Sequence, residues 1–164
     1  LCETVLDHLF GDANPEQLNH LLDTFVEIYA QELCVDTKVY AGVLEFLQYC
    51  QTHQITMACV TNKPEHLARG ILDVLGLSAY FKMVIGGDSL AERKPHPLPL
   101  LHCMQQQNAL ASETLMIGDS SNDVEAARRA GIDCIVVSYG YNHGENILDC
   151  QPQQVVDNLC ELIG

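Results

Sequence analysis

The sequence predicts an α/β protein, a doubly wound parallel sheet with a helical segment ahead of it. Beyond residue 54, short continuous apolar runs alternate with helical stretches of about ten residues, a pattern that is typical of parallel strands covered on both faces. Before residue 54, the apolar residues recur only at helical spacing. The 164 residues correspond to one domain of roughly 150 residues with a small addition.

Two helices are expected before the first strand. Residues 14–32 carry apolar side chains at the i, i+3, i+4 and i+7 positions of an amphipathic helix. A second stripe of the same kind predicts a helix over residues 42–53. We place a domain boundary between the two helices, which gives a helical segment, 1–37, and an α/β core, 38–164.

Strands and helices then alternate along the core. The expected strands cover residues 55–60, 83–85, 114–117 and 134–137. The expected helices cover residues 64–75, the stretch after Pro97 and residues 121–130, and the tail over 155–163 is expected to hold a short strand or turn and a last helix. Ligands bind outside the carboxyl ends of the strands in open parallel sheets. The residues that directly follow each strand are therefore the candidates for a site.

The composition excludes several classes of protein. With 8 basic and 22 acidic residues the formal net charge is −14, so the chain cannot build the basic face that nucleic acid or an anionic membrane requires. The apolar runs reach about six residues, against the ~18 of a membrane helix, and the acidic start lacks the basic region of a signal peptide. The eight cysteines show no C-x-x-C spacing, which predicts reduced thiols and a cytoplasmic protein rather than a zinc site.

The first candidate residues follow the strand over 55–60. Thr61-Asn62-Lys63-Pro64 places a hydroxyl just ahead of a helix, and the N–H groups and dipole at a helix N-terminus favour an anion. Two interpretations stay open, because Thr61 can bind an anion or only cap that helix.

Three charged residues are further candidates. Asp119 directly follows the strand over 114–117, where a carboxylate suits Mg²⁺. Asp123 also has a structural interpretation, because Ser120 and Asp123 have the spacing of a capping box. Lys94 stands before Pro95 in a stretch whose prolines fix the backbone, although a lone lysine is more commonly a solvated surface charge.

Together, the order and spacing of these elements resemble motifs two, three and four of the haloacid dehalogenase superfamily. The resemblance is carried by VTNKP at 60–64, VIGGD at 84–88, KPHPLPLL at 94–101, IGDSSND at 117–123 and YGYN at 139–142. Within the superfamily, the sequence is similar to phosphoglycolate phosphatases. The resemblance covers about residues 39–164 and implies a haloacid dehalogenase-like Rossmannoid core, with 1–37 similar to the C-terminal part of a helical cap.

The resemblance implies hydrolysis of a small phosphorylated metabolite, such as 2-phosphoglycolate, with Mg²⁺ as the cofactor and an aspartyl-phosphate intermediate. It implies that the Thr61 side chain and the Asn62 backbone N–H bind phosphate oxygens and that Lys94 neutralises charge during transfer. It also implies that Asp119 binds Mg²⁺, with Asp123 acting through a water molecule or from behind the direct ligands. Such chemistry needs positioning and charge neutralisation above all.

One motif of the superfamily is absent. Its nucleophile belongs to an Asp-x-Asp-x-Thr motif after the first strand, and no two of the eleven aspartates here are separated by one residue. The sequence therefore resembles a protein without its first strand, its nucleophile and the first half of its cap. In that topology the first strand lies between the strands over 55–60 and 114–117, so we expect these two not to pair and the chain alone to be inactive. A smaller departure is Ala41, where the family often has proline.

Other interpretations stay open. The intact protein is a phosphatase for another small sugar phosphate, a phosphomutase, or a dehalogenase. Dehalogenases need no metal, so the carboxylates of Asp119 and Asp123 disfavour that branch. Since the chain holds no nucleophile, a non-catalytic interaction module is the remaining class.

Overall fold

The computed structural model describes residues 37–140, 142 and 146–163, together with Asn14, His20, Leu21 and Thr24. The chain divides into two compact units, Leu1–Thr37 and Lys38–Gly164. In the first unit His20, Leu21 and Thr24 are helical. The rest of the helix expected over residues 14–32, apart from Asn14, lies outside the described residues.

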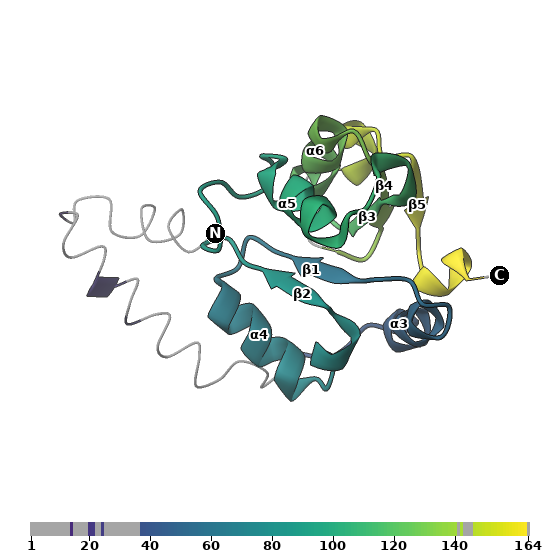
Figure 1. Cartoon of the computed structure of the whole chain (residues 1–164), viewed down its shortest axis with the longest axis horizontal. Helices are drawn as coiled ribbons and strands as arrows, with labels where there is room; N and C mark the ends of the chain where they lie inside the picture. The colour runs from purple at the N-terminus through teal and green to yellow at the C-terminus, as the bar shows by residue number, and fades with distance from the viewer. Residues whose placement is uncertain are drawn as a thin grey trace. The chain divides into compact units, whose positions relative to one another are not determined.

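The second unit alternates helices and strands (Figure 1). Its elements are α3 (Val43–Thr52), β1 (Ala58–Val60), α4 (Glu65–Val74), β2 (Met83–Ile85), α5 (Leu98–Gln107), β3 (Leu115–Gly118), α6 (Ser121–Ala130), β4 (Asp133–Val137) and β5 (Gln154–Val156). Short 3₁₀ helices cover Ser78–Tyr80 (η1), Ala111–Glu113 (η2), Ile147–Cys150 (η3) and Leu159–Leu162 (η4). None of the helices in the described part of the chain has the length and apolar character to cross a membrane.

The five strands form two parallel sheets, β1-β2 and β3-β4-β5. The expected break is present, because β1 and β3 belong to different sheets and do not pair. The first strand is shorter than expected, three residues in place of six. Its register with β2 runs from Ala58–Met83 to Val60–Ile85, and a strand with a partner on one side only extends no further than that partner.

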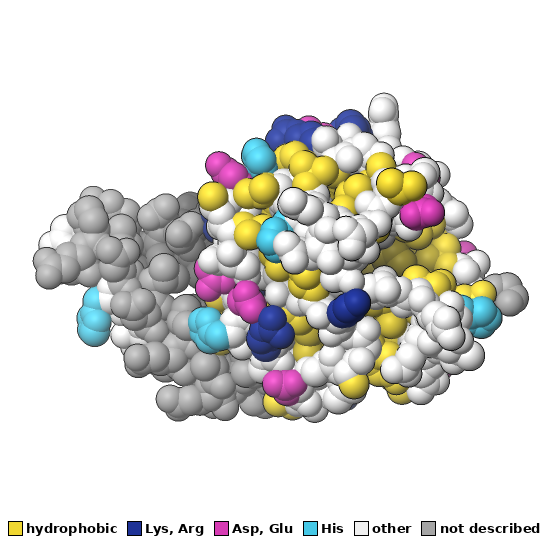
Figure 2. All heavy atoms as spheres, in the orientation of Figure 1, with side chains coloured by type: hydrophobic (Ala, Val, Ile, Leu, Met, Phe, Trp, Pro, Cys, Tyr) yellow, Lys and Arg dark blue, Asp and Glu magenta, His cyan; other side chains and the backbone are white. Residues whose placement is uncertain are grey.

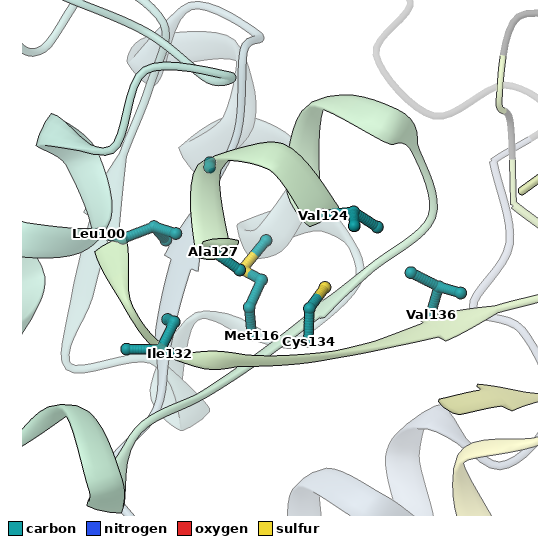
Figure 3. Close-up of a cluster of buried hydrophobic side chains, with 8 residues drawn as sticks. Leu100, Met116, Val124, Ala127, Ile132, Cys134 and Val136 are labelled. Atoms are coloured by element: carbon teal, nitrogen blue, oxygen red, sulfur yellow. The ribbon is translucent and has the colours of Figure 1, made fainter. Parts of the chain in front are cut away.

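Helices cover both faces of the sheets, as in a doubly wound fold. The side chains of each strand alternate between the faces. One face packs against α5 and α6 around a cluster that is shown in Figure 3: Leu100, Met116, Val124, Ala126, Ala127, Ile132, Cys134 and Val136. Val60 of β1 packs against the same cluster, so this layer of helices serves both sheets.

The opposite face has two further clusters. Under β1 and β2, side chains of α3, α4, β2 and the turn after α4 form one buried cluster: Leu47, Ala68, Leu72, Leu77 and Val84. Under β4 and β5 the buried residues are Val137, Val156 and Leu159, with Phe46 of α3 against them. Leu159–Leu162 are therefore fixed to the core, and the last helix that the sequence predicted is a single 3₁₀ turn, η4.

Candidate active site

A cavity of about 330 Å³ lies at the carboxyl ends of β1 and β3. Its wall includes Thr61 after β1, Lys94 before α5, Asp119 and Asp123 after β3, and Tyr139 after β4. Residues far apart in the sequence thus meet at one edge of the two sheets, which is where open parallel sheets bind ligands.

The cavity continues between the two sheets. Val60 of β1 and Met116 and Ile117 of β3 line it from the two unpaired strand edges. Figure 2 shows hydrophobic side chains exposed across this hollowed part of the core unit. The strand residues Ala58 of β1 and Leu115 of β3 are exposed, whereas Val84 of β2 and Val136 of β4 are buried.

Thr61 is placed with its hydroxyl available as a donor. Its backbone N–H donates to the carbonyl of Ile85 at 2.9 Å, which continues the β1–β2 ladder. Its Oγ1 accepts a hydrogen bond from the Lys63 backbone N–H at 3.1 Å. A hydroxyl keeps one O–H donor beyond what it accepts, so Thr61 can still donate to an anion in the cavity.

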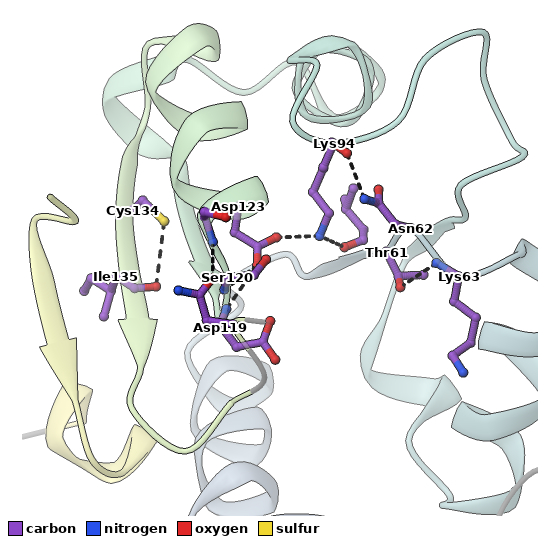
Figure 4. Close-up of polar contacts among 12 residues, drawn as sticks. Thr61, Asn62, Lys63, Lys94, Asp119, Ser120, Asp123, Cys134 and Ile135 are labelled. Atoms are coloured by element: carbon purple, nitrogen blue, oxygen red, sulfur yellow. Dashed lines mark hydrogen bonds and ion pairs between the residues drawn. The ribbon is translucent and has the colours of Figure 1, made fainter. Parts of the chain in front are cut away.

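Asn62 links two loops of the site. Its Nδ2 donates to the carbonyl of Lys94 at 2.8 Å (Figure 4). Its Oδ1 is buried and has no hydrogen-bond partner among the described residues. The side chain of Asn62 therefore holds Lys94 in place, a structural role that the sequence analysis did not foresee.

One N–H group at the N-terminus of α4 is already bound by the chain itself. The Asp88 carboxylate accepts a hydrogen bond from the Glu65 backbone N–H at 2.7 Å. The helix dipole favours a negative charge at this position, and the chain supplies that charge itself from the loop after β2. The Glu65 N–H is therefore not available to an anion, and anion binding at this end of α4 stays a prediction.

Lys94 is a buried cation with two partners. The residue is 9% exposed, and its Nζ contacts Oδ1 of Asp123 at 2.6 Å and the carbonyl oxygen of Val60 at 2.6 Å (Figure 4). The Val60 carbonyl lies on the edge of β1 that has no strand partner. Lys94 thus points toward the strand ends and covers one acceptor of the open edge.

Asp123 has both oxygens engaged. Oδ1 accepts from Lys94, and Oδ2 accepts from the backbone N–H groups of Asp119 at 3.0 Å and Ser120 at 3.1 Å and from the Ser120 hydroxyl at 2.9 Å. The structural interpretation of Asp123 is confirmed, because it completes the capping box of α6. Asp123 also lines the cavity, and its role toward Mg²⁺ stays a prediction. Burial would raise the pKa of Asp123, but the Lys94 charge and these hydrogen bonds outweigh it and bring the pKa below its ordinary value.

Asp119 stands between Asp123 and the loop after β4. Its carboxylate points into the space between the two groups of residues in Figure 4. A Cβ atom on Gly140 would lie 2.0 Å from the Cβ of Asp119. Only glycine at position 140 allows the loop to approach Asp119 this closely.

The carboxylates of the cavity suit a magnesium ion that has few direct protein ligands. The described residues contain no cluster of three or more His, Cys, Asp or Glu side chains that could enclose a metal. Mg²⁺ is usually held by one or two carboxylates and completes its shell with waters and substrate phosphate. Asp119 directly follows β3 and lines the cavity, so it can be such a carboxylate. Asp123 also lines the cavity, and both of its oxygens accept hydrogen bonds from the protein. These residues therefore fit Mg²⁺ with Asp119 as the direct ligand.

The structure adds residues that the sequence analysis did not select for the site. Tyr40, just before α3, lines the cavity beside Tyr139 and Gly140. Asn142 is buried, and its Oδ1 accepts a hydrogen bond from the Ser121 backbone N–H at 2.9 Å. The sequence signal for Tyr139, Gly140 and Asn142 is their position directly after a strand. Tyr40 follows no strand, so the sequence carries no such signal for it.

Comparisons with known proteins identify a family of hydrolases that this chain resembles. A family model of haloacid dehalogenase-like hydrolases matches residues 1–137. The chain is 42% identical over 159 residues to a phosphoglycolate phosphatase of Pseudomonas syringae and 39% identical over 158 residues to one of Nitrosococcus oceani. Each alignment covers 96% of the chain, and the chain spans 57% of the first relative and 70% of the second.

Solved structures show the same fold. A crystal structure of a predicted phosphoglycolate phosphatase from Haemophilus somnus superposes with a TM-score of 0.87 and 30% identity, over 92% of this chain and 67% of that one. CbbY from Rhodobacter sphaeroides, in complex with xylulose-(1,5)-bisphosphate, has a TM-score of 0.79 and 20% identity over 92% of this chain and 68% of its own, a likeness of fold alone. The family match covers most of the sequence and includes every site residue from Thr61 to Asp123. The chain belongs to the haloacid dehalogenase-like hydrolases.

Proposed function

We propose that this chain forms most of the active site of a Mg²⁺-dependent phosphatase for a small phosphomonoester of the 2-phosphoglycolate kind. The observation that carries the proposal is the meeting of Thr61, Lys94, Asp119 and Asp123 on the wall of one cavity. The names of the relatives at 42% and 39% identity support this substrate class.

The chain's own residues have separate tasks in this proposal. The Thr61 hydroxyl and the Asn62 backbone N–H donate to phosphate oxygens and orient the phosphorus. Lys94 faces the charge that develops on the transferring group, and Asp123 keeps the Lys94 ammonium in place through their 2.6 Å contact. Asp119 holds Mg²⁺, which neutralises phosphate charge when bound. Preorganised charges of this kind supply most of the rate in phosphoryl transfer.

The attacking carboxylate has to come from outside the described residues. We propose that it lies at the end of a further strand between β1 and β3, and the unpaired edges of these strands support this placement. The carboxylate oxygen bonds to phosphorus as the ester oxygen leaves and takes a proton from the second carboxyl group of the same motif. Water then cleaves the aspartyl-phosphate and returns a proton to that second group, which releases inorganic phosphate and restores the attacking carboxylate.

The proposal also includes the compartment. All six cysteines that the structure describes are free thiols, and reduced thiols are usual in the cytoplasm. We therefore infer a cytoplasmic enzyme that acts on a phosphorylated metabolite.

The test compares this chain with the full-length protein, by which we mean the natural polypeptide that contains it. Mass spectrometry of the natural polypeptide, compared with 18.1 kDa for the chain, shows whether further residues belong to it. Phosphate release from 2-phosphoglycolate is then measured with Mg²⁺ for both. We expect turnover by the full-length protein and none by the chain alone.

Two variants make the test specific. Thr61→Val removes the hydroxyl with little change of shape and should lower kcat of the full-length protein by at least tenfold, on the order of one lost phosphate hydrogen bond. Thr52→Val removes a hydroxyl that only bonds the Gln48 carbonyl on the exposed side of α3 and should have no effect. Equal turnover by the chain alone would overturn the external nucleophile, and isomerisation of a sugar phosphate without phosphate release would identify a phosphomutase instead.

A further inference from the structure

Two tyrosines from distant parts of the core meet at the cavity wall. Tyr40 precedes α3 and Tyr139 follows β4, and their ring centroids are 4.7 Å apart at an interplanar angle of 41°. Both line the cavity together with Asp119 and Gly140. This separation is in the range of attractive aromatic pairs.

The loop that carries Tyr139 contacts the Asp119 loop at two further points. Gly140 packs directly on Asp119, where a Cβ would lie only 2.0 Å from the Cβ of Asp119. Asn142, 8% exposed, accepts a hydrogen bond from the backbone N–H of Ser121. Gly140 and Asn142 therefore restrict the position of the loop that carries Asp119.

The two tyrosines are anchored differently. Tyr139 packs against the buried cluster around Val137, Val156 and Leu159. The Tyr40 carbonyl accepts from the Val43 backbone N–H at 3.2 Å, which fixes its backbone at the start of α3. Tyr40 is 60% exposed, so core packing does not account for a tyrosine here, whereas its contact with Tyr139 does.

We propose that Tyr40 and Tyr139 form an aromatic clamp that holds the loop over 138–140 against Asp119 and so positions this carboxylate for the metal. The clamp rests on the proposed function, because it assumes that Asp119 binds Mg²⁺. Both tyrosines are positioning residues, which act on the metal through Gly140 and Asp119. Tyr40 is the third residue of the second unit, so the clamp ties the start of that unit to the metal site.

The test measures metal binding directly. Mn²⁺ titrations of the full-length protein, followed by electron paramagnetic resonance, give a Kd that does not depend on turnover. We expect Tyr40→Ala and Tyr139→Leu each to raise the Kd by about 10- to 100-fold, the usual effect of losing a group that supports a metal ligand. Tyr40→Phe and Tyr139→Phe keep the ring pair and should stay within about twofold of the unmodified protein, since ring contact rather than the hydroxyl carries the clamp.

Two controls separate the possible outcomes. Tyr49→Ala breaks another ring pair, Tyr49–His53 with centroids 3.9 Å apart on α3, and should leave the Kd unchanged. Asp119→Asn should abolish tight Mn²⁺ binding. If Asp119→Asn has no effect, the metal assignment falls and the clamp falls with it. If Asp119→Asn abolishes binding while the Ala and Leu variants bind normally, only the clamp is overturned, and a loss in the Phe variants also overturns it.

Discussion

The ion pair between Lys94 and Asp123 gives the sharpest prediction for stability. Lys94 and Asp123 are 9% and 3% exposed, and their charged atoms are 2.6 Å apart. Removing one partner of a buried pair leaves the other charge without compensation and costs about 3–5 kcal/mol. Because domains are stable by only about 5–15 kcal/mol, we expect Asp123→Asn to lower the free energy of unfolding by a large fraction.

The two partners should not be equivalent. After Lys94→Met, Asp123 keeps the three donors from Asp119 and Ser120 on Oδ2. After Asp123→Asn, the Lys94 ammonium keeps only the Val60 carbonyl among the contacts described here and faces a neutral amide. Asp123→Asn should therefore be the more destabilising change, and the double variant should cost less than the two single changes together, because residues in contact couple.

Urea unfolding of the full-length protein, followed by circular dichroism, measures these free energies. Glu125→Gln is a matched control, because Glu125 pairs with Arg128 and Arg129 on the exposed side of α6. Exposed pairs contribute about 0–1 kcal/mol. The reasoning is refuted if Asp123→Asn costs no more than Glu125→Gln, or if the Lys94 and Asp123 changes are additive.

Three further predictions concern pH, the loop after β4 and the thiols. Folding lowers the pKa of Asp123 below its ordinary value of 3.8. The stabilising contribution of Asp123 is therefore complete above about pH 4 and is lost as the pH falls through the folded pKa. The free energy of unfolding should fall more steeply below pH 4 in the unmodified protein than in Asp123→Asn, as measured by acid titration. Gly140→Ala places a methyl group against Asp119 and should weaken Mg²⁺ binding by about tenfold or more. Calorimetric titration measures the Kd, and an unchanged Kd would contradict the close contact. Burial raises the pKa of Cys134 to about 12, so pulsed alkylation with mass spectrometry should label the half-buried Cys150 before Cys134, and early labelling of Cys134 would contradict its burial.

Local patterns predicted much of the fold. Residues 83–85 form a strand with the expected bounds, because three apolar residues stand directly before Gly86-Gly87. The bounds of α6 at Ser121–Ala130 followed from a capping box at one end and Gly131 at the other, and both signals lie within the helix or beside it. Capping boxes and terminal glycines involve residues that are close together in the sequence, so they can be recognised in a single sequence.

Contacts between distant residues could not be predicted in this way. Lys94 was expected at the site, but its contacts with Val60 and Asp123 span 34 and 29 positions of sequence. The capping of α4 by Asp88 across 23 positions was missed for the same reason. Tyr40 precedes a helix, follows no strand and has no charge, so neither the strand-end rule nor electrostatics singles it out.

The charges of the cavity indicate the order in which ligands bind. Among the described residues that line it, Lys94 is the cation and Asp119 and Asp123 are the anions, so the wall carries one net negative charge. Lys94 is already paired with Asp123, and a phosphate dianion in the cavity would be repelled by the negative charge of the Asp119 carboxylate. A divalent cation on Asp119 reverses the sign of the site, and close charges in a partly buried site interact by several kcal/mol at an effective dielectric constant of about 20.

We therefore expect inorganic phosphate to bind the full-length protein at least tenfold more tightly with Mg²⁺ than without it in calorimetric titrations, and Asp119→Asn to reduce that difference. Equal phosphate affinity with and without Mg²⁺ would mean that Lys94 and the N–H donors suffice, and that Asp119 does not set the charge of this site.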